Sequence, residues 1–196
     1  MLKKIGILGD IGSGKSFAAT QFNCPVFNAD KEVNKIYKKN RICFNKLSKK
    51  LPNYIKSYPI NKSELTKAIL ENKKNLKKIV NIVHPLIRKK MNFFLKKNRK
   101  RKMIVLDIPL LIENKLNRKS DILVFVDAKK KEINKRLKNR KNYNKKIIDS
   151  FRKIQKSLSY KKKLSTYVIK NNFKLLTIKK RVKIIKEDII NERSSS

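Results

Sequence analysis

The stretch GDIGSGKSF, residues 9–17, carries three of the four glycines in a chain of 196 residues. It follows the apolar run KKIGIL and precedes SFAATQF, which has the residue pattern of a short helix. Gly9, Gly14, Lys15 and Ser16 complete the pattern G-x-x-x-x-G-K-[ST] between an expected strand and an expected helix, which is the setting of a phosphate-binding loop. The stretch therefore predicts a nucleoside triphosphate site.

Each part of this loop has a chemical task. Glycines let the backbone adopt positive φ and approach phosphate oxygens closely, since a Cβ would block the approach. Lys15 is expected to bridge the β- and γ-phosphates of the nucleotide, and the Ser16 hydroxyl is expected to ligate Mg2+. Phe17 offers only its backbone N–H. The residues predicted to bind the nucleoside triphosphate here are Gly9, Gly12, Ser13, Gly14, Lys15, Ser16 and Phe17.

Strand-like and helix-like segments alternate along the chain and predict an α/β fold. The runs KMIVLDIPLLI and DILVFVDA are rich in β-branched residues and indicate buried strands. Strand followed by helix, repeated, implies a parallel sheet, so we expect a three-layer P-loop NTPase fold with a central parallel sheet of about five strands. The expected strands are residues 3–8, 25–30, 103–108, 121–126 and 165–171.

Two helical segments extend this pattern. Apolar residues three and four positions apart dominate residues 31–97, which predicts a helical substrate flap. A strongly basic helix follows the fourth strand, and residues 129–165 are expected to form a lid. The sequence has no internal repeat and no Gly/Ser-rich linker, so we expect a single P-loop kinase domain over residues 1–196.

The net charge of +40, from 54 Lys and Arg against 14 Asp and Glu, would ordinarily suggest nucleic acid or an anionic membrane as a partner. The lysines run along the whole chain with an even excess of Asn and Ile, whose codons are A/T-rich. Genome composition therefore accounts for the charge, and specific nucleic-acid binding is not expected. No apolar stretch is long enough to span a bilayer, and the two cysteines form no disulfide framework, which favours a cytoplasmic location.

Other segments narrow the class of P-loop protein. A GTPase is expected to carry N-K-x-D after a strand, and FVDAKKKE offers nothing similar. A motor usually ends a strand in paired carboxylates, whereas the two acids of VLDIPLLIE stand six apart. The layout favours a small-molecule kinase with a lid. Two alternatives stay open: a kinase for another nucleoside or nucleotide, whose typical D-G-[FY]-P-R stretch is missing here, and a basic nucleic-acid-binding ATPase.

From Lys3 to about Ile190 the chain resembles dephospho-coenzyme A kinase. The motifs that carry the resemblance, in the family's order, are GDIGSGKS, NAD, NIVHPLI, LDIPLLIE, KRLKNR, a glutamine at Gln155, and YVIKNN. The resemblance implies ATP-dependent phosphorylation of the ribose 3'-hydroxyl of dephospho-coenzyme A, the last step of coenzyme A biosynthesis. It implies dephospho-coenzyme A as the partner and a monomer or weak homo-oligomer. The acceptor-site residues that it implies are Asp30, His84, Asp107, Leu111 and Glu113.

The acidic residues also have readings of their own. Asp30 is expected at the carboxyl end of the second strand, where ligands bind in open α/β folds, and there it could act as the base for the ribose hydroxyl. It could also cap a helix that starts at Lys31, and both roles are compatible. Asp107 could hold the Mg2+ shell through water or cap the turn that follows. Glu113 could bond the acceptor or brace its loop.

The remaining site residues are basic. His84, the one histidine, precedes Pro85, where the helix is expected to kink or start afresh. Arg136 and Arg140 are four apart and are expected on one helix face, directed at the triphosphate or at solvent. The resemblance favours Arg140 as the lid arginine. The residues predicted to be catalytic are Lys15, Asp30 and Arg140.

The sequence departs from the usual family pattern at several positions near the expected site. An acid at position 10 should be tolerable only if it points outward from the phosphates. Loss of the usual arginine at position 151 is expected to move phosphate contacts to Arg152 or to nearby lysines. The departures are Asp10, Phe17, Phe151, Thr166 and Lys170.

Overall fold

The computed structural model describes residues 2–140 and 143–191, and the contacts among them divide the chain into two compact units. The first unit comprises Met1–Asn28, Asn98–Tyr143 and Ile154–Ser196, and the second comprises Ala29–Lys97 and Asn144–Lys153. The predicted flap, residues 31–97, lies in the second unit, whereas the predicted lid, residues 129–165, is shared between both.

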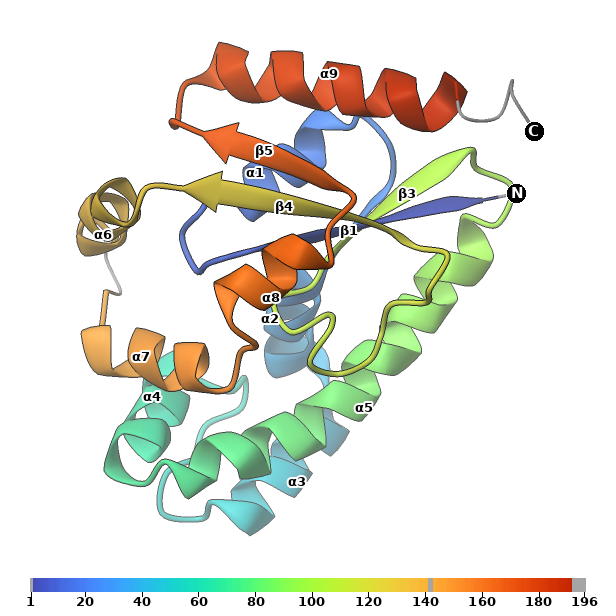
Figure 1. Cartoon of the computed structure of the whole chain (residues 1–196). Helices are drawn as coiled ribbons and strands as arrows, with labels where there is room; N and C mark the ends of the chain where they lie inside the picture. The colour runs from blue at the N-terminus through green and yellow to red at the C-terminus, as the bar shows by residue number, and fades with distance from the viewer. Residues whose placement is uncertain (1, 141–142, 192–196) are drawn as a thin grey trace. The chain divides into compact units, whose positions relative to one another are not determined.

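The first unit is built on a five-stranded parallel sheet with the strand order β2-β3-β1-β4-β5 (Figure 1). The carboxyl ends of parallel strands meet at one edge of a sheet, where open α/β folds bind ligands. The predicted parallel sheet is confirmed. Its strands are β1 (Lys3–Gly9), β2 (Val26–Asn28), β3 (Met103–Asp107), β4 (Ile122–Ala128) and β5 (Tyr167–Asn171).

Helices of the first unit cover both faces of this sheet. α1 packs against α9, and these two helices also contact β1, β3 and β5, while α8 contacts β1 from the other side (Figure 1). α6 follows β4 directly in the chain. The helices are α1 (Lys15–Gln21), α6 (Lys130–Lys138), α8 (Leu158–Lys163) and α9 (Leu175–Asn191).

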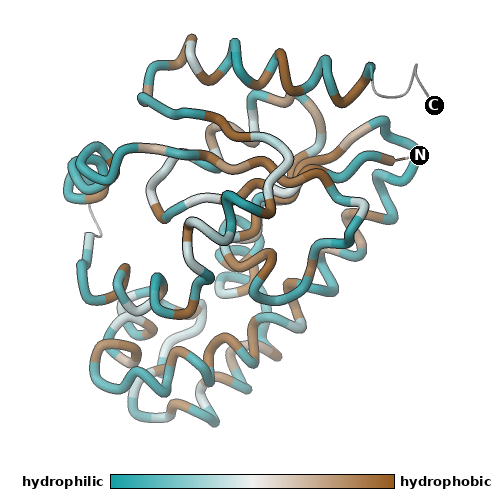
Figure 2. The backbone as a smooth tube through the Cα atoms, viewed as in Figure 1, coloured by the Kyte–Doolittle hydropathy of each residue, from teal (hydrophilic) through white to brown (hydrophobic). Residues whose placement is uncertain are grey.

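The apolar strand runs explain why the sheet is buried on both faces. Figure 2 shows the central strands as mostly hydrophobic. Ile5 and Ile7 of β1 are 0% exposed and lie in the core with buried residues of α1 and α9. Gly6 alternates with them, and side-chain atoms of Leu111 and Leu123 lie 2.5 and 2.8 Å from where a Cβ of Gly6 would stand. The strand β1 is thereby fixed from both sides at the centre of the sheet.

The second unit is a cluster of helices around α5, which contacts α2, α3 and α4, and α7 contacts α4. The helices are α2 (Ala29–Lys39), α3 (Arg41–Lys50), α4 (Lys62–Glu71), α5 (Lys74–Lys97) and α7 (Lys145–Lys153). α5 continues through Pro85, so of the two predicted outcomes, a kink or a fresh start, the fresh start is wrong. A proline removes only one backbone donor, and Val83 and Ile87 on either side of it are buried in the packing that holds the helix together.

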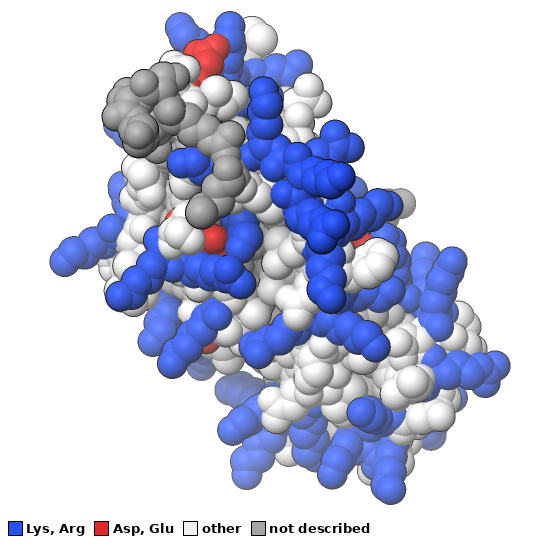
Figure 3. All heavy atoms as spheres, turned by 90° about the vertical axis from the view of Figure 1, so that its right-hand side faces the viewer, with Lys and Arg blue, Asp and Glu red and all other residues white. Residues whose placement is uncertain are grey.

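The basic side chains are distributed over the surface. Figure 3 shows Lys and Arg across the whole visible face, with few Asp and Glu among them. This distribution fits a charge that arises from the composition of the whole chain rather than from one segment.

Candidate active site

The phosphate loop, residues 9–17, connects the end of β1 with the start of α1, as the sequence predicts. Gly9 has φ +143° and Gly14 has φ +93°, values that L side chains rarely adopt. A Cβ on Gly9 would stand 2.6 Å from the carbonyl oxygen of Val126, and one on Gly14 would stand 2.5 Å from Nδ2 of Asn171. Both glycines are therefore required by the backbone turn and by the close neighbours of the loop.

Ser13 and Lys15 give the loop the character of an anion site. The Ser13 hydroxyl is buried and has no hydrogen-bond partner among the described residues, which is unusual for a buried polar atom. Lys15 folds back over the loop, where its Nζ donates to the carbonyl oxygens of Gly9 at 3.2 Å and Asp10 at 2.7 Å. A buried hydroxyl, a lysine ammonium and a glycine-lined turn together fit a polyphosphate.

Asp10 is buried in the turn of the phosphate loop. It is 8% exposed, and its Oδ1 accepts the N–H of Ile11 at 2.7 Å. Short acidic side chains readily bond to the backbone of the next residues in a turn, which accounts for the bond to Ile11. The acid therefore helps to shape the turn of the phosphate loop.

The end of the loop is open to solvent. Ser16 is exposed in the first turn of α1, and the Phe17 side chain is 41% exposed. Among residues 2–140 and 143–191, no group of three or more His, Cys, Asp and Glu gathers as a metal site. The single exposed hydroxyl of Ser16 suits Mg2+, because this ion binds proteins through one or two ligands and takes substrate phosphates for the rest.

Asp107 ends β3 beside the phosphate loop's own strand, as predicted. Asp107 is 3% exposed, and Nδ2 of Asn28 donates to its Oδ2 across the register pair that links β2 and β3. Sequence reasoning missed the role of Asn28, which was expected inside a strand over residues 25–30, whereas β2 ends there. The strand-end placement of Asp107 is confirmed, and a role in holding Mg2+ remains a prediction.

Glu113 braces a loop in this structure. Its Oε1 accepts the N–H of Lys156 at 2.8 Å and forms an ion pair with Lys161 Nζ, also at 2.8 Å. Lys161 is 1% exposed and donates to Oε1 of Gln155 at 3.0 Å. Leu111, from the same segment as Glu113, is 1% exposed and packs on Gly6, so its side chain serves the core.

The two arginines do not share a helix face, contrary to the prediction. α6 ends at Lys138, and Arg140 follows the capping residue Asn139 in a turn. The cap closes early because the Asn139 N–H bonds to the Leu137 carbonyl. Arg140 is exposed, whereas the Arg136 guanidinium lies 4.6 Å from the centre of the Phe173 ring.

Asp30 and His84 belong to the second unit. β2 ends at Asn28 and α2 begins at Ala29, so Asp30 lies in the first turn of α2. The prediction that Asp30 ends the second strand is wrong. The helix starts too early for Asp30 to be its cap, so that alternative is also wrong. Asp30 is exposed, and His84 is half-buried on α5. An acid in the first turn is stabilised by the helix dipole.

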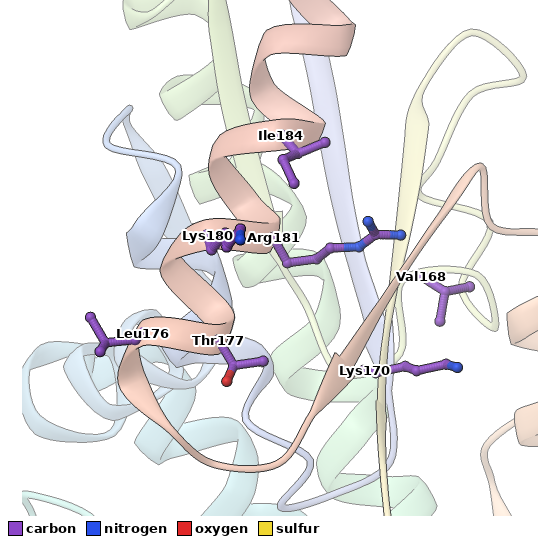
Figure 4. A pocket seen from close by; sticks show the side chains of 7 residues that line it. All are labelled: Val168, Lys170, Leu176, Thr177, Lys180, Arg181 and Ile184. Carbon is purple, nitrogen blue, oxygen red and sulfur yellow. The ribbon is translucent and has the colours of Figure 1, made fainter.

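The remaining departures, Phe151, Thr166 and Lys170, lie on α7 and at β5. Phe151 is half-buried on α7, next to Arg152, whose NH1 is 3.9 Å from Oδ1 of Asp149. Thr166 and Lys170 are exposed. Figure 4 shows Lys170 at a groove of about 610 Å³ between β5 and α9, which is separate from the predicted site residues. Its lining residues are Val168, Lys170, Leu176, Thr177, Lys180, Arg181 and Ile184.

A search of residues 2–140 and 143–191 finds no helix that combines the length and the hydropathy of a membrane span.

Comparisons with known proteins identify what this arrangement is similar to. A family model for dephospho-CoA kinase matches residues 3–176. The dephospho-CoA kinase of Wolbachia pipientis wMel is 34% identical over 170 residues, which cover 84% of this chain and 87% of that protein. The dephospho-CoA kinase of Wolbachia sp. subsp. Brugia malayi is 30% identical over 197 residues, 98% of each chain.

A solved structure supports the fold. The dephospho-CoA kinase from Campylobacter jejuni aligns with a TM-score of 0.65 and 21% identity, over 96% of this chain and 97% of that one. The predicted three-layer α/β fold of P-loop kinases is thereby confirmed.

Proposed function

This chain belongs to the dephospho-CoA kinase family, and we propose that it performs the family's reaction with ATP on the phosphate loop and with Asp30 and Arg140 as catalytic residues. Dephospho-CoA kinases are enzymes that catalyse the last step of coenzyme A biosynthesis, with ATP as the phosphate donor. The rival assignments, another small-molecule kinase or a nucleic-acid-binding ATPase, are not favoured.

The observation that carries the proposal is the phosphate loop itself. Its glycines at positive φ, the buried hydroxyl of Ser13, which has no hydrogen-bond partner among the described residues, and the inward-folded Lys15 together suit a triphosphate. Lys15 would leave the loop carbonyls and pair with the β- and γ-phosphates.

Mg2+ would be held at the open end of the loop. The Ser16 hydroxyl would be one ligand, and phosphate oxygens of ATP would supply others. Asp107 ends a strand adjacent to β1, and it would hold a water of the metal shell. When bound, the ion neutralises charge that develops on the transferred phosphate.

The transfer itself needs a base and a cation. The ribose 3'-oxygen would form a bond to the γ-phosphorus while the bond from that phosphorus to the β–γ bridging oxygen breaks, and ADP leaves. Asp30 would take the proton of the attacking hydroxyl, and Arg140 would stabilise charge on the equatorial phosphate oxygens. Asp30 is supported by its exposure and by its place two residues beyond the end of β2.

The experiment compares two acids in the first turn of α2, Asp30 and Glu32. Asp30→Asn should lower kcat about 100-fold or more, because general-base catalysis commonly contributes at least that factor, while affinity for ATP stays unchanged. Glu32→Gln is the matched control and should keep wild-type kcat. An Asp30→Asn enzyme with unchanged turnover would remove Asp30 from the mechanism.

Location and assembly remain proposals. Free thiols at Cys24 and Cys43 support a cytoplasmic protein. A monomer or weak homo-oligomer is proposed from the family resemblance, and sedimentation at micromolar concentration would test it. Specific nucleic-acid binding is not part of the proposal, and an ATPase rate indifferent to added RNA or DNA is the expected result.

A further inference from the structure

Asn171 joins the last strand of the sheet to the phosphate loop. It ends β5, is 6% exposed, and its Nδ2 donates to the carbonyl oxygen of Ser13 at 2.7 Å. Its Oδ1 accepts the N–H of Phe173, also at 2.7 Å. A carbonyl only accepts and an N–H only donates, so these partners fix the orientation of the amide. One buried side chain thus ties together Ser13 and β5, which are 158 positions apart.

The bond to Ser13 sets the orientation of the peptide between Ser13 and Gly14. In a planar trans peptide the carbonyl oxygen and the following N–H point in opposite directions. Because Asn171 holds the carbonyl on its own side, the Gly14 N–H is directed to the other side. A loop that binds phosphate must present N–H groups and turn its carbonyls away. Asn171 imposes that arrangement at this peptide.

Asn171 and Gly14 fit each other closely. The Cβ that Gly14 lacks would stand 2.5 Å from Nδ2 of Asn171, well inside contact distance. The missing side chain of Gly14 therefore makes room for Asn171. Gly14 of the phosphate-loop motif is thus matched to Asn171, a residue outside that motif.

The same side chain also holds the start of the segment after β5. Phe173 has φ +63°, a left-handed conformation that is unfavourable for a residue with a side chain, and its N–H is bound by Asn171. The Phe173 ring lies against the guanidinium of Arg136 on α6. Asn171 therefore contacts the phosphate loop directly and is linked through Phe173 to Arg136, a predicted ATP ligand.

We propose that Asn171 is a positioning residue for phosphoryl transfer. It keeps the Gly14 N–H directed at the phosphates of ATP and keeps Phe173 against Arg136, and it acts through these groups without touching a reacting atom. The proposal rests on the proposed function in one respect, namely that ATP binds at the phosphate loop.

The test compares two neighbouring asparagines. Asn171→Asp keeps the side-chain shape and the acceptor for Phe173, but it places an oxygen against the Ser13 carbonyl. Asn172→Asp adds the same charge one position along, where the side chain is exposed and its Oδ1 accepts the Lys174 N–H at 3.1 Å. Asn171→Asp should raise the KM for ATP about tenfold or more, from the loss of a buried hydrogen bond and the repulsion that replaces it.

Two further readouts separate positioning from general damage. The KM for dephospho-coenzyme A should stay within about twofold in Asn171→Asp, and both constants should stay within about twofold in Asn172→Asp. A defect in folding alone would reduce the fraction of active enzyme and leave both Michaelis constants unchanged. An Asn171→Asp enzyme with the wild-type KM for ATP overturns the proposal.

If circular dichroism shows that Asn171→Asp does not fold, the wild-type protein decides the question. Saturating Mg-ATP should slow hydrogen exchange in the peptide that contains the Phe173 N–H, because the ligand tightens the loop that Asn171 holds. Unchanged exchange in that peptide, with ATP bound, overturns the proposal. A wild-type protein that binds no ATP counts instead against the proposed function, before any variant is compared.

Discussion

Lys161 and Glu113 form a buried ion pair, with 2.8 Å between Nζ and Oε1 and side chains that are 1% and 10% exposed. The pair connects α8 to the segment that follows β3. Removing two charges from water is costly, and the cost is recovered only while both partners are present. The second carboxylate oxygen of Glu113 is buried without a hydrogen-bond partner among the described residues, so this site depends strongly on the lysine.

Replacing Lys161 should therefore destabilise the protein strongly. Lys161→Met is expected to lower the free energy of unfolding by about 3 to 5 kcal/mol, because it leaves the Glu113 charge buried and unpaired. Urea unfolding monitored by circular dichroism measures the change. The double variant Lys161→Met/Glu113→Leu should recover most of the loss, since it removes both charges.

The adjacent lysine is a matched control. Lys162 pairs with Asp127 at the same 2.8 Å, but these side chains are 50% and 37% exposed. Lys162→Met should cost less than about 1 kcal/mol, as exposed pairs do. Equal losses from the two lysine variants would show that burial of the Lys161 pair has no energetic consequence.

Gly14→Ala should disable the loop with modest effect on the rest of the fold. A left-handed φ of +93° costs about 1 to 2 kcal/mol for alanine, and the new methyl would meet Nδ2 of Asn171 at 2.5 Å. We expect affinity for ATP to fall about tenfold or more, measured by titration calorimetry, as the loop shifts to relieve the clash. Thr20→Ala, on the exposed side of α1, should bind ATP normally. Normal binding by Gly14→Ala would contradict the fit described between Gly14 and Asn171.

Cys43 should make stability depend on pH in the alkaline range. The thiol is 0% exposed, and burial raises its pKa from an ordinary 9.0 to about 11. The unfolded chain ionises at the lower value, so it binds fewer protons than the folded protein between these limits, and stability falls as pH rises. Two pKa units correspond to a loss of about 3 kcal/mol from this group.

Urea unfolding at several pH values from about 8 to 11 measures this dependence. The lowest pH is the reference, because the Cys43 thiol is mostly neutral there in both the folded and the unfolded protein. Cys43→Ala should be less stable than the wild type at neutral pH and should lose stability less steeply above pH 9.0, where the thiol of the unfolded wild type ionises. The same slope in both proteins would show that Cys43 does not contribute.

The two arginines should have different kinetic roles. Arg140 is exposed beyond the end of α6, and if it acts on the transferring phosphate as proposed, Arg140→Ala should lower kcat about 1,000-fold, the lower end of what such arginines contribute. Arg136 contacts the Phe173 ring, so Arg136→Ala should act mainly on the KM for ATP. Lys138→Ala removes a nearby charge and should change neither constant. A reversed pattern between Arg136 and Arg140 would exchange their assigned roles.

Local sequence patterns predicted the elements that depend on nearby residues. The strand, glycine turn and helix around residues 9–17 form as expected, because turn geometry and apolar runs are short-range signals. The ends of the elements differ from the predicted ones. α2 starts at Ala29, so Asp30 lies in a helix and not at the end of a strand. α6 likewise ends at Lys138, so Arg140 lies outside the helix and does not share a helix face with Arg136. One or two residues at a boundary decide where a side chain points.

Contacts between distant segments had no local signal. Lys161 is one of 54 Lys and Arg residues, and nothing in its neighbours marks it as buried. Asn171 belongs to a motif of the resemblance, but its bond to Ser13 depends on how β5 lies beside β4 and the loop. Such contacts follow from the folded topology, so local sequence patterns do not predict them.

The measurement that tests the account most directly is product formation. Purified protein would be incubated with Mg-ATP and dephospho-coenzyme A, alongside AMP, CMP and GMP as other acceptors, and the products identified by mass spectrometry. The account predicts coenzyme A phosphorylated on the ribose 3'-hydroxyl, no phosphorylation of the other acceptors, and loss of the product in Lys15→Ala. ATP binding without coenzyme A formation, or equal product from Lys15→Ala, would contradict it.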